Sequence, residues 1–438
     1  MTPEEGNCNF KKMRKFSLIT YGCKLNQADS EIIYGILSEK FQPSLEDEAD
    51  FVVINSCGVI EKTQRKIERK IQELKKKHKK IILAGCLPLI SEKIVDQVDG
   101  VIGPQNILKI QEAVRQIFFG QKPIYLDKTP IDKAKLCSFK MRVSFTATAI
   151  IPISEGCLGE CSYCATKFAR GKLYSFSQDS ILKEIKMALS EGFKEIHLTS
   201  QDIACFGLER GKYELPHLLK KIIEIPGRFC VRIGMGNPQH FKRILNPLLS
   251  LYASPKIYKY LHIPVQSGSD RVLKDMRRGY KTKDFLEIVE AFKKRFPDLM
   301  LVTDIIVGYP TETEEDFKKT VDLIKRASPR IVNITKFSRR EKTEAGLLKD
   351  LPDRIKTERS RFLNKLCLKI KEEDSKRFVG REEKVLVVKE GKNNTFLARP
   401  IHFRAIILKN AKIGNFLRVK IKEAKPNYLI GEVMQLDS

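Results

Sequence analysis

Two series of alternating strands and helices constrain the fold of this 438-residue chain more than any other feature. In the first series, three short apolar runs are separated by helical patterns, the second of which spans residues 61–80. Strands that alternate with helices pair in parallel, with helices on both faces of the sheet. The sequence therefore predicts an N-terminal α/β domain over residues 14–121. Its expected strands are residues 16–20, 51–54 and 81–84.

A second series of strands and helices begins at residue 143, after a connector with little periodicity at residues 121–141. It contains six strand–helix repeats, and six repeats fit a partial barrel better than the closed barrel of eight. We expect this partial barrel to occupy residues 143–375. The expected strands are residues 146–153, 195–198, 230–233, 259–263, 300–306 and 331–336.

The pattern changes again near residue 384, to short β runs punctuated by Gly391, Gly414 and Gly431. About five short strands in roughly 60 residues are typical of a small antiparallel barrel. The predicted fold is thus an α/β chain with an N-terminal parallel-sheet domain, a central partial (βα)6 barrel, and a small antiparallel β-barrel at residues 378–437.

Three closely spaced cysteines follow the first strand of the second series. Cys157, Cys161 and Cys164 have the spacing Cys-x3-Cys-x2-Cys, which suits a soft metal centre. Three ligands leave one iron of a four-iron cluster open to a small molecule, as a catalytic zinc site keeps an open position. A zinc knuckle needs a fourth ligand nearby, and the next candidates downstream are the distant His197 and Cys205. A structural zinc site is the alternative.

Three further cysteines stand at equivalent places in the N-terminal domain. Cys23, Cys57 and Cys86 each follow one of the predicted strands. The carboxyl ends of parallel strands lie at one edge of a sheet, where ligand sites form. We therefore expect these thiols to converge on a second metal site. The alternative is three unrelated buried thiols, because free cysteine is often buried.

The charge of the chain indicates a polyanionic partner. Lys and Arg number 81 against 54 Asp and Glu, a net charge of +27. Such a surplus favours nucleic acid binding, although Lys enrichment can also mark adaptation to heat. No apolar run approaches the roughly 18 residues of a membrane span, and residues 1–12 show no signal-peptide core. We expect a soluble, cytoplasmic protein without a membrane partner.

Several sequence motifs resemble those of one enzyme family. The cysteine motif at residues 157–164 resembles that of the radical S-adenosylmethionine (radical SAM) enzymes, and other segments resemble their methylthiotransferase branch. The stretch at residues 164–171 is similar to the archaeal and eukaryotic tRNA subgroup. The other matching segments are Y-G-C-K-L-N-Q-A-D-S-E (21–31), N-S-C-G-V (55–59), A-G-C-L-P (84–88), H-I-P-V-Q-S-G-S-D-R-V-L (262–273), T-D-I-I-V-G-Y-P-T-E-T (303–313) and G-N-F-L-R-V-K-I (414–421), the last of which resembles a TRAM nucleic-acid-binding domain.

The resemblance implies two [4Fe-4S] clusters and S-adenosylmethionine as cofactors. Cys157, Cys161 and Cys164 would hold the cluster that cleaves S-adenosylmethionine to a 5′-deoxyadenosyl radical. A second cluster, which carries the sulfur, would be held by Cys23, Cys57 and Cys86.

The implied activity is that of a transferase of alkylthio groups. It would convert N6-threonylcarbamoyladenosine at tRNA position 37 to its 2-methylthio derivative. The expected partners are tRNA, an unidentified electron donor and an unidentified sulfur donor, and we expect a monomer. Two alternatives are a methylthiotransferase that acts on a ribosomal protein and a non-catalytic, zinc-stabilised RNA-binding protein.

Polar side chains near the predicted strand ends are candidates for binding the cofactor. A charged group inside a barrel strand costs about 2–7 kcal/mol or more unless it is paired, which favours a role for Arg232 and Asp304. An internal ion pair between these two residues is the alternative. The cofactor candidates are Tyr163, Ser200, Asp202, Arg232, Asn237, Gln266, Asp304 and Gly308.

Four arginines are candidates for binding RNA. Arg399 and Arg404 stand among phenylalanines, a mixture that suits stacking and backbone attraction. Arg339 and Arg340 lie in the loop S-R-R-E-K-T, where many relatives of the resembled family have a P-R-P-G-T-like loop. A second departure is Gly58, where that family often has Thr.

Overall fold

The computed structural model describes residues 13–59, 61–142 and 146–436. The chain divides into two compact units, one of residues 1–129 and 139–141 and the other of residues 130–138 and 142–438. The expected boundaries at residues 143 and 437 lie outside the described residues, so the three-domain division stays a prediction. None of the helices in the described residues is long and apolar enough to cross a membrane.

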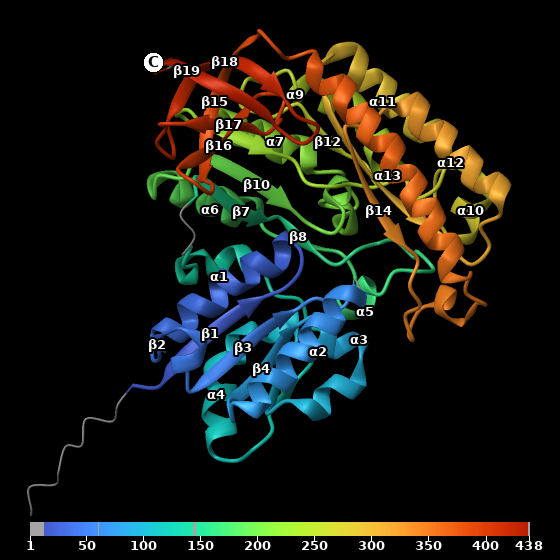
Figure 1. Ribbon diagram of the computed structural model, residues 1–438. Coiled ribbons are helices and arrows are strands. Elements are labelled where there is room, and N and C mark those ends of the chain that lie inside the picture. Colours follow the sequence, from blue (N-terminus) through green and yellow to red (C-terminus); the bar gives the residue numbers. More distant parts are fainter. Residues whose placement is uncertain (1–12, 60, 143–145, 437–438) are drawn as a thin grey trace, which may run out of the picture. The chain divides into compact units, whose positions relative to one another are not determined.

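The first unit is built on a six-stranded sheet in which all strands are parallel (Figure 1). On one face, Ile67 and Ile71 of α2 pack over the central strands. On the other face, Phe51 contacts Phe118 of α4. Helices on both faces explain why the central strands are continuous apolar runs. In sheet order the strands are β2 (Gln42–Pro43), β1 (Lys15–Thr20), β3 (Phe51–Ser56), β4 (Lys80–Gly85), β5 (Gly100–Ile102) and β6 (Ile124–Tyr125), and the helices are α1 (Lys24–Ser38), α2 (Glu61–Lys76), α3 (Leu87–Ile90) and α4 (Ile110–Phe118).

The second unit contains the predicted partial barrel. Its strands form two parallel three-stranded sheets, ordered β11-β10-β7 and β12-β13-β14, with a single parallel bridge between Val231 and Ile257. The six strands are β7 (Thr148–Pro152), β10 (Glu195–Thr199), β11 (Cys230–Arg232), β12 (Tyr260–His262), β13 (Met300–Val307) and β14 (Ile331–Lys336).

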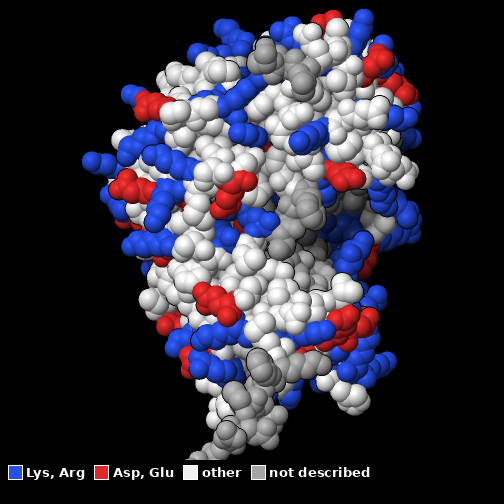
Figure 2. Space-filling model, turned by 90° about the vertical axis from the view of Figure 1, so that its left-hand side faces the viewer, with Lys and Arg blue, Asp and Glu red and all other residues white. Residues whose placement is uncertain are grey.

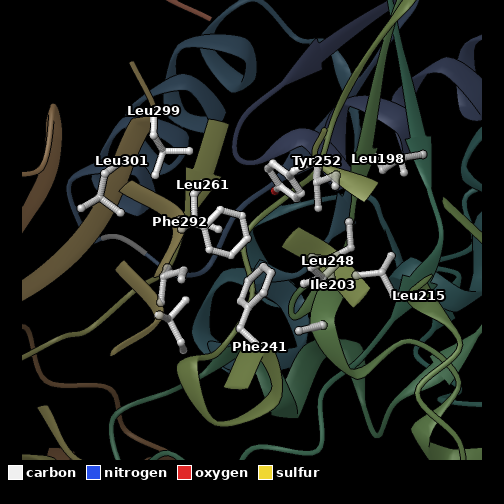
Figure 3. Packing of buried hydrophobic residues seen from close by; sticks show 14 of the residues in the cluster. Leu198, Ile203, Leu215, Phe241, Leu248, Tyr252, Leu261, Phe292, Leu299 and Leu301 are labelled. Atoms are coloured by element: carbon white, nitrogen blue, oxygen red, sulfur yellow. The ribbon is translucent and has the colours of Figure 1, made fainter. Parts of the chain in front are cut away.

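Alternate residues of these strands pack outward against helices. Leu198, Leu261 and Leu301 join Phe241 and Phe292 from the helices in one buried cluster (Figure 3). The residues between them on each strand face the other side of the strands, where the polar candidates lie. The covering helices are α6 (Gln178–Ser190), α7 (Leu215–Glu224), α8 (Pro238–Arg243), α9 (Leu245–Leu251), α10 (Asp270–Asp275), α11 (Thr282–Arg295), α12 (Glu314–Ala327) and α13 (Asp353–Lys376).

The last strands close into a small barrel, as expected, in the order β15-β16-β17-β19-β18. Its strand pairs are antiparallel as predicted, except that β17 and β19 pair in parallel. Along β18, Leu417 and Val419 are buried, whereas Arg418 and Lys420 are exposed. Strict alternation of this kind follows from a barrel whose inside is filled with apolar side chains. The strands are β15 (Glu382–Glu390), β16 (Thr395–Pro400), β17 (Ile406–Lys409), β18 (Phe416–Ala424) and β19 (Leu429–Leu436).

Candidate active site

The Cys-x3-Cys-x2-Cys motif forms a loop between β8 (Ser154–Glu155) and α5 (Thr166–Arg170). Gly156 has a φ of +77°, and a Cβ there would lie 2.0 Å from the carbonyl oxygen of Lys172, so only glycine fits. The Gly159 N–H donates to Cys157 Sγ at 3.2 Å. A Cβ on Gly159 would lie 3.3 Å from Cys157 Sγ and 3.6 Å from Cys161 Sγ. The sulfurs of Cys157 and Cys161 therefore border the same small space beside Gly159.

The thiol chemistry of this loop fits a metal cluster. Burial, together with Asp202 and the other two thiols, raises the pKa of Cys157 to about 12, although the hydrogen bond from the Gly159 N–H acts to lower it. Such a thiol stays protonated near neutral pH unless a cation replaces the proton, and the thiolate is the form that binds metals. Arg278 supplies one positive charge nearby, because its Nη1 donates to Cys161 Sγ at 3.1 Å.

Buried polar atoms without partners lie at the carboxyl end of β10. Within the described residues, Ser200 Oγ and Gln201 Oε1 are buried and make no hydrogen bond. Buried polar groups are normally satisfied, so these two atoms point to a polar ligand. S-adenosylmethionine, with its amino, carboxylate and ribose groups, is a ligand of this kind.

Asp202 is held in place next to these atoms. Its Oδ1 accepts from the backbone N–H groups of Ala204 at 3.2 Å and Asn237 at 3.0 Å, and His240 Nε2 lies 3.8 Å from Oδ2. Burial raises the pKa of Asp202, while His240, the Asn237 N–H and Arg278 act to lower it. Asn237 itself caps α8 by accepting from the Gln239 N–H, which gives its side chain a structural use.

The alternative of an ion pair between Arg232 and Asp304 does not occur. Arg232 Nη2 donates to the Tyr260 hydroxyl at 2.6 Å. Asp304 Oδ1 lies 2.9 Å from His262 Nε2 and accepts from Asn333 at 2.7 Å. The two residues are therefore parts of separate polar groups on the inward side of the strands.

Gln266, Gly308 and Tyr163 have different surroundings. Gln266 has a φ of +71°, a strained value of the kind that occurs at functional sites. The space beside Gly308 is filled, since a Cβ there would lie 2.2 Å from Cγ of Lys356. This weighs against a close approach of the adenine of S-adenosylmethionine to the backbone at Gly308. Tyr163 packs beside an apolar cluster that includes Tyr309 and Phe337.

The N-terminal cysteines lie at the carboxyl edge of their sheet. Cys23 precedes α1, Cys57 follows β3 and Cys86 follows β4. Asn26 Oδ1 lies 3.7 Å from Cys23 Sγ and 4.0 Å from Cys86 Sγ. A Cβ on Gly22, whose φ is +119°, would lie 2.8 Å from Cys57 Cβ. The three cysteines thus surround Gly22 and Asn26.

Asn26 links the loops at this edge of the sheet. Its Nδ2 donates to the carbonyl oxygens of Tyr21 at 3.0 Å and Ser56 at 2.8 Å, which fixes the loops that carry Cys23 and Cys57. At Gly58, a Cβ would lie 2.5 Å from Cδ1 of Ile90, so a Thr at this position would require the Ile90 side chain to move.

Within the described residues, no three His, Cys, Asp or Glu side chains close around a point that could hold a single metal ion.

Sequence reasoning missed Asn26 and Arg278. Asn26 lies within the motif at residues 21–31, three positions after a candidate ligand, and this proximity was a usable signal. No spacing or pattern in the sequence links Arg278 to Cys161, since only the fold brings them together.

Two of the candidate RNA-binding arginines are engaged inside the second unit. Arg404 is 3% exposed and makes two hydrogen bonds to Asp374, at 2.9 and 2.8 Å. The Arg399 guanidinium lies 4.0 Å from the ring centre of Phe403 and donates to the Phe403 carbonyl at 3.0 Å. Phe403 is buried among Tyr258, Tyr260, Met300 and Val302. Arg399 and Arg404 therefore join the small barrel to the partial barrel instead of facing solvent.

The other two arginines, Arg339 and Arg340, lie close to the loop that carries the Cys-x3-Cys-x2-Cys motif. Arg339 is exposed and donates to the Gly346 carbonyl at 2.8 Å, whereas Arg340 is buried. The Ala345 N–H donates to the carbonyl oxygen of Ser162, between the second and third cysteines, at 3.0 Å. This hydrogen bond fixes the basic loop next to the Cys-x3-Cys-x2-Cys motif.

Comparisons with known proteins cover most of the chain. Residues 15–103 match the Uncharacterized protein family UPF0004, residues 151–324 the Radical SAM superfamily and residues 376–434 the TRAM domain. A probable threonylcarbamoyladenosine tRNA methylthiotransferase of Archaeoglobus fulgidus is 50% identical over 419 residues, which span 96% of this chain and 98% of that protein. A protein of the same description from Pyrococcus abyssi is 41% identical over 96% of this chain and 100% of its own length.

A solved structure shares the fold. It is the radical S-adenosylmethionine methyltransferase TsrM from Kitasatospora setae, with cobalamin and a [4Fe-4S] cluster bound. The TM-score is 0.56 at 14% identity, over 76% of this chain and 74% of that one. At this identity the likeness supports the fold of the chain and nothing further.

Proposed function

The chain belongs to the threonylcarbamoyladenosine tRNA methylthiotransferase family, and from this premise we propose that it converts N6-threonylcarbamoyladenosine at tRNA position 37 to its 2-methylthio derivative. The family brings S-adenosylmethionine and one [4Fe-4S] cluster as cofactors. Adenine C2 carries a hydrogen without useful acidity, so a side-chain base does not reach it. When bound, the cluster and S-adenosylmethionine supply the radical chemistry that this step requires.

The observation that carries the proposal is the small space beside Gly159, which is bordered by the sulfurs of Cys157 and Cys161. Cys157, Cys161 and Cys164 hold the cluster there and leave one iron for S-adenosylmethionine. Ser200 and Gln201 hydrogen-bond the polar groups of the cofactor, and Asp202 keeps their loop in place through its bonds to backbone N–H groups.

A second [4Fe-4S] cluster is part of the proposal. Cys23, Cys57 and Cys86 hold it at the carboxyl edge of the N-terminal sheet, and Asn26 orients the loops that carry them. Held by only three thiolates, such a cluster would have one position without a protein ligand, and it would supply the sulfur-transfer chemistry there.

We place tRNA on two basic surfaces of the second unit. One is the loop with Arg339 beside the cluster motif. The other is the outer face of the small barrel, where Lys384 of β15 pairs across the strands with Arg418, and Lys420 is exposed on the same strand. Figure 2 shows Lys and Arg spread widely over the face that it draws. This surplus of positive charge suits a phosphate backbone.

Analysis of tRNA nucleosides tests the proposal. In cells that lack the gene, the 2-methylthio derivative should be absent and its threonylcarbamoyl precursor should accumulate. The wild-type gene should restore the product, and a Cys157→Ala gene should not. Retention of the methylthio nucleoside in the deletion strain would refute the tRNA assignment, and a ribosomal protein would become the substrate to examine.

A further inference from the structure

Arg278 places a cation directly against a candidate cluster ligand. Its Nη1 donates to Cys161 Sγ at 3.1 Å, its Nη2 lies 3.4 Å from the Pro264 carbonyl oxygen, and its Nε donates to the Tyr280 hydroxyl at 3.1 Å. Tyr280 is 7% exposed and donates to the carbonyl oxygen of Val265 at 2.8 Å. Each guanidinium nitrogen thus has a partner in the chain, and the tyrosine that supports it is itself fixed.

We infer that Arg278 is a positioning residue that raises the reduction potential of the [4Fe-4S] cluster at Cys157, Cys161 and Cys164. The inference rests on the assignment of a cluster to these cysteines under the proposed function. Reduction adds one electron to the cluster from an external one-electron donor and makes the cluster more negative. A permanent positive charge beside Cys161 stabilises this reduced state, and hydrogen bonds to cluster sulfurs act in the same direction.

The surroundings of Arg278 leave its positive charge free to act on the cluster. The contacts of Arg278 are with a thiol, a phenol and a backbone carbonyl, none of which is a carboxylate. Its charge also acts on Asp202, whose pKa it lowers, but no ion pair joins the two. Arg278 is half-buried, and a partly buried charge is screened less by solvent and salt than an exposed one.

An alternative use of Arg278 is to bind the carboxylate of S-adenosylmethionine. The geometry favours the cluster, because Nη1 is already directed at sulfur and Nε at the Tyr280 hydroxyl. A ligand role would require Arg278 to give up at least one of these contacts. A cluster role predicts a change in reduction potential, whereas a ligand role predicts a loss of affinity for S-adenosylmethionine.

The test is a redox titration of the full-length chain, reconstituted without oxygen and followed by electron paramagnetic resonance. A Cys23→Ala, Cys57→Ala, Cys86→Ala background leaves one cluster to observe. Arg278→Gln removes the charge, and Arg278→Lys keeps it with a different geometry. Arg277→Gln is the matched control, since this neighbouring arginine is exposed and pairs with Glu344 at 2.7 Å.

For Arg278→Gln we expect the ratio of reduced to oxidised cluster at a fixed potential to fall at least tenfold, a shift of 59 mV to more negative potential for a one-electron couple. Arg278→Lys should lie between this variant and the wild type, and Arg277→Gln should match the wild type. Iron content is measured on every sample to show that the cluster is present.

Other results overturn the inference. An unchanged potential in Arg278→Gln with full iron content refutes it, and a simultaneous tenfold loss of S-adenosylmethionine affinity would make Arg278 a ligand of the cofactor. If Arg278→Gln fails to hold iron, Arg278→Met decides, because methionine also lacks the charge, and an unchanged potential there refutes the inference. If the wild-type cysteines at 157–164 bind no iron, the proposed function fails instead.

Discussion

At the scale of single residues, cysteine spacing predicts two sulfur-rich sites, and both stay predictions. Spacing shows which thiols are close in sequence or at equivalent strand ends. It does not show the carboxamide of Asn26 between Cys23 and Cys86, or the guanidinium of Arg278 on Cys161, because those contacts depend on how loops pack. The mixture of arginines and phenylalanines made Arg404 a candidate for binding RNA, whereas Asp374 holds Arg404 inside the chain.

Asn26→Ala should reduce the iron content of the anaerobically reconstituted chain by roughly half, since it removes one of two four-iron clusters. The physical reason is the loss of the bonds from Asn26 Nδ2 to the Tyr21 and Ser56 carbonyls, which hold the loops of Cys23 and Cys57. Iron analysis and S-adenosylmethionine cleavage check this. Gln27→Ala, at the partly buried neighbour on the same helix, is the control and should keep its iron. Full iron in Asn26→Ala would contradict the assigned role.

Glu195 should make the stability of the protein depend on acid pH. Burial by itself raises the pKa of Glu195, but His197 and Arg399 outweigh burial, and the pKa falls to about 2 from 4.5. A carboxyl with a lowered folded-state pKa stabilises the fold above its unfolded pKa and loses this contribution as pH falls. We expect roughly 3 kcal/mol to be lost between about pH 4.5 and pH 2.

Denaturant unfolding as a function of pH measures this effect. Glu195→Gln should flatten the decline in this range, although it costs stability at neutral pH through its buried partners, Thr148 and Tyr258 among them. An equally steep decline in Glu195→Gln would assign the acid sensitivity to other groups.

At the scale of elements, hydrophobic periodicity predicted the six strands of the partial barrel because each carries a run of outward apolar residues such as Leu198 and Leu301. It did not predict where the sheet divides, between β11 and β12, since this division depends on pairing and not on composition. Periodicity also indicates that a side chain is buried without saying against what. Phe403 illustrates this, because it packs outside its own small barrel.

The turn between β16 and β17 packs on the amino-terminal ends of the partial barrel's strands. Phe403 lies between Tyr258 and Tyr260, with both ring centres 4.8 Å away, and the Lys259 N–H donates to the Ile401 carbonyl at 2.7 Å. The φ of Phe403, +62°, is unusual for a bulky residue and is maintained by this packing. The small barrel is therefore a structural part of the second unit.

Phe403→Ala should destabilise the chain by about 3–5 kcal/mol, the usual cost of deleting a buried phenyl ring. Unfolding by denaturant measures the change, and hydrogen exchange at residues 257–263 should rise. Phe362→Ala on α13 is the matched control, because Phe362 is 55% exposed, and it should cost less than about 1 kcal/mol. A similar small cost for Phe403→Ala would show that the turn does not depend on this ring.

At the scale of the whole molecule, the net charge of +27 predicts binding to RNA that weakens steeply with salt. Composition gave this expectation, but the location of the charge required the structure, which exposes Arg418 and Lys420 and buries Arg404.

Arg418→Glu with Lys420→Glu should weaken tRNA binding about tenfold or more at moderate salt and lower the salt slope by about two, one for each phosphate contact. Filter binding over a salt series measures both quantities. Lys318→Glu, at an exposed position on α12, changes charge without touching the small barrel and should have little effect. Equal weakening by all of these changes would mean that general attraction, and not this face, binds tRNA.

The most direct test of the two-cluster account is one measurement series on the Cys23→Ala, Cys57→Ala, Cys86→Ala chain. Reconstituted without oxygen and given tRNA, S-adenosylmethionine, sulfide and a one-electron reductant, it should contain about half the wild-type iron. It should still cleave S-adenosylmethionine to 5′-deoxyadenosine but form no methylthio nucleoside. Full iron content, or methylthio product from this chain, would contradict the account.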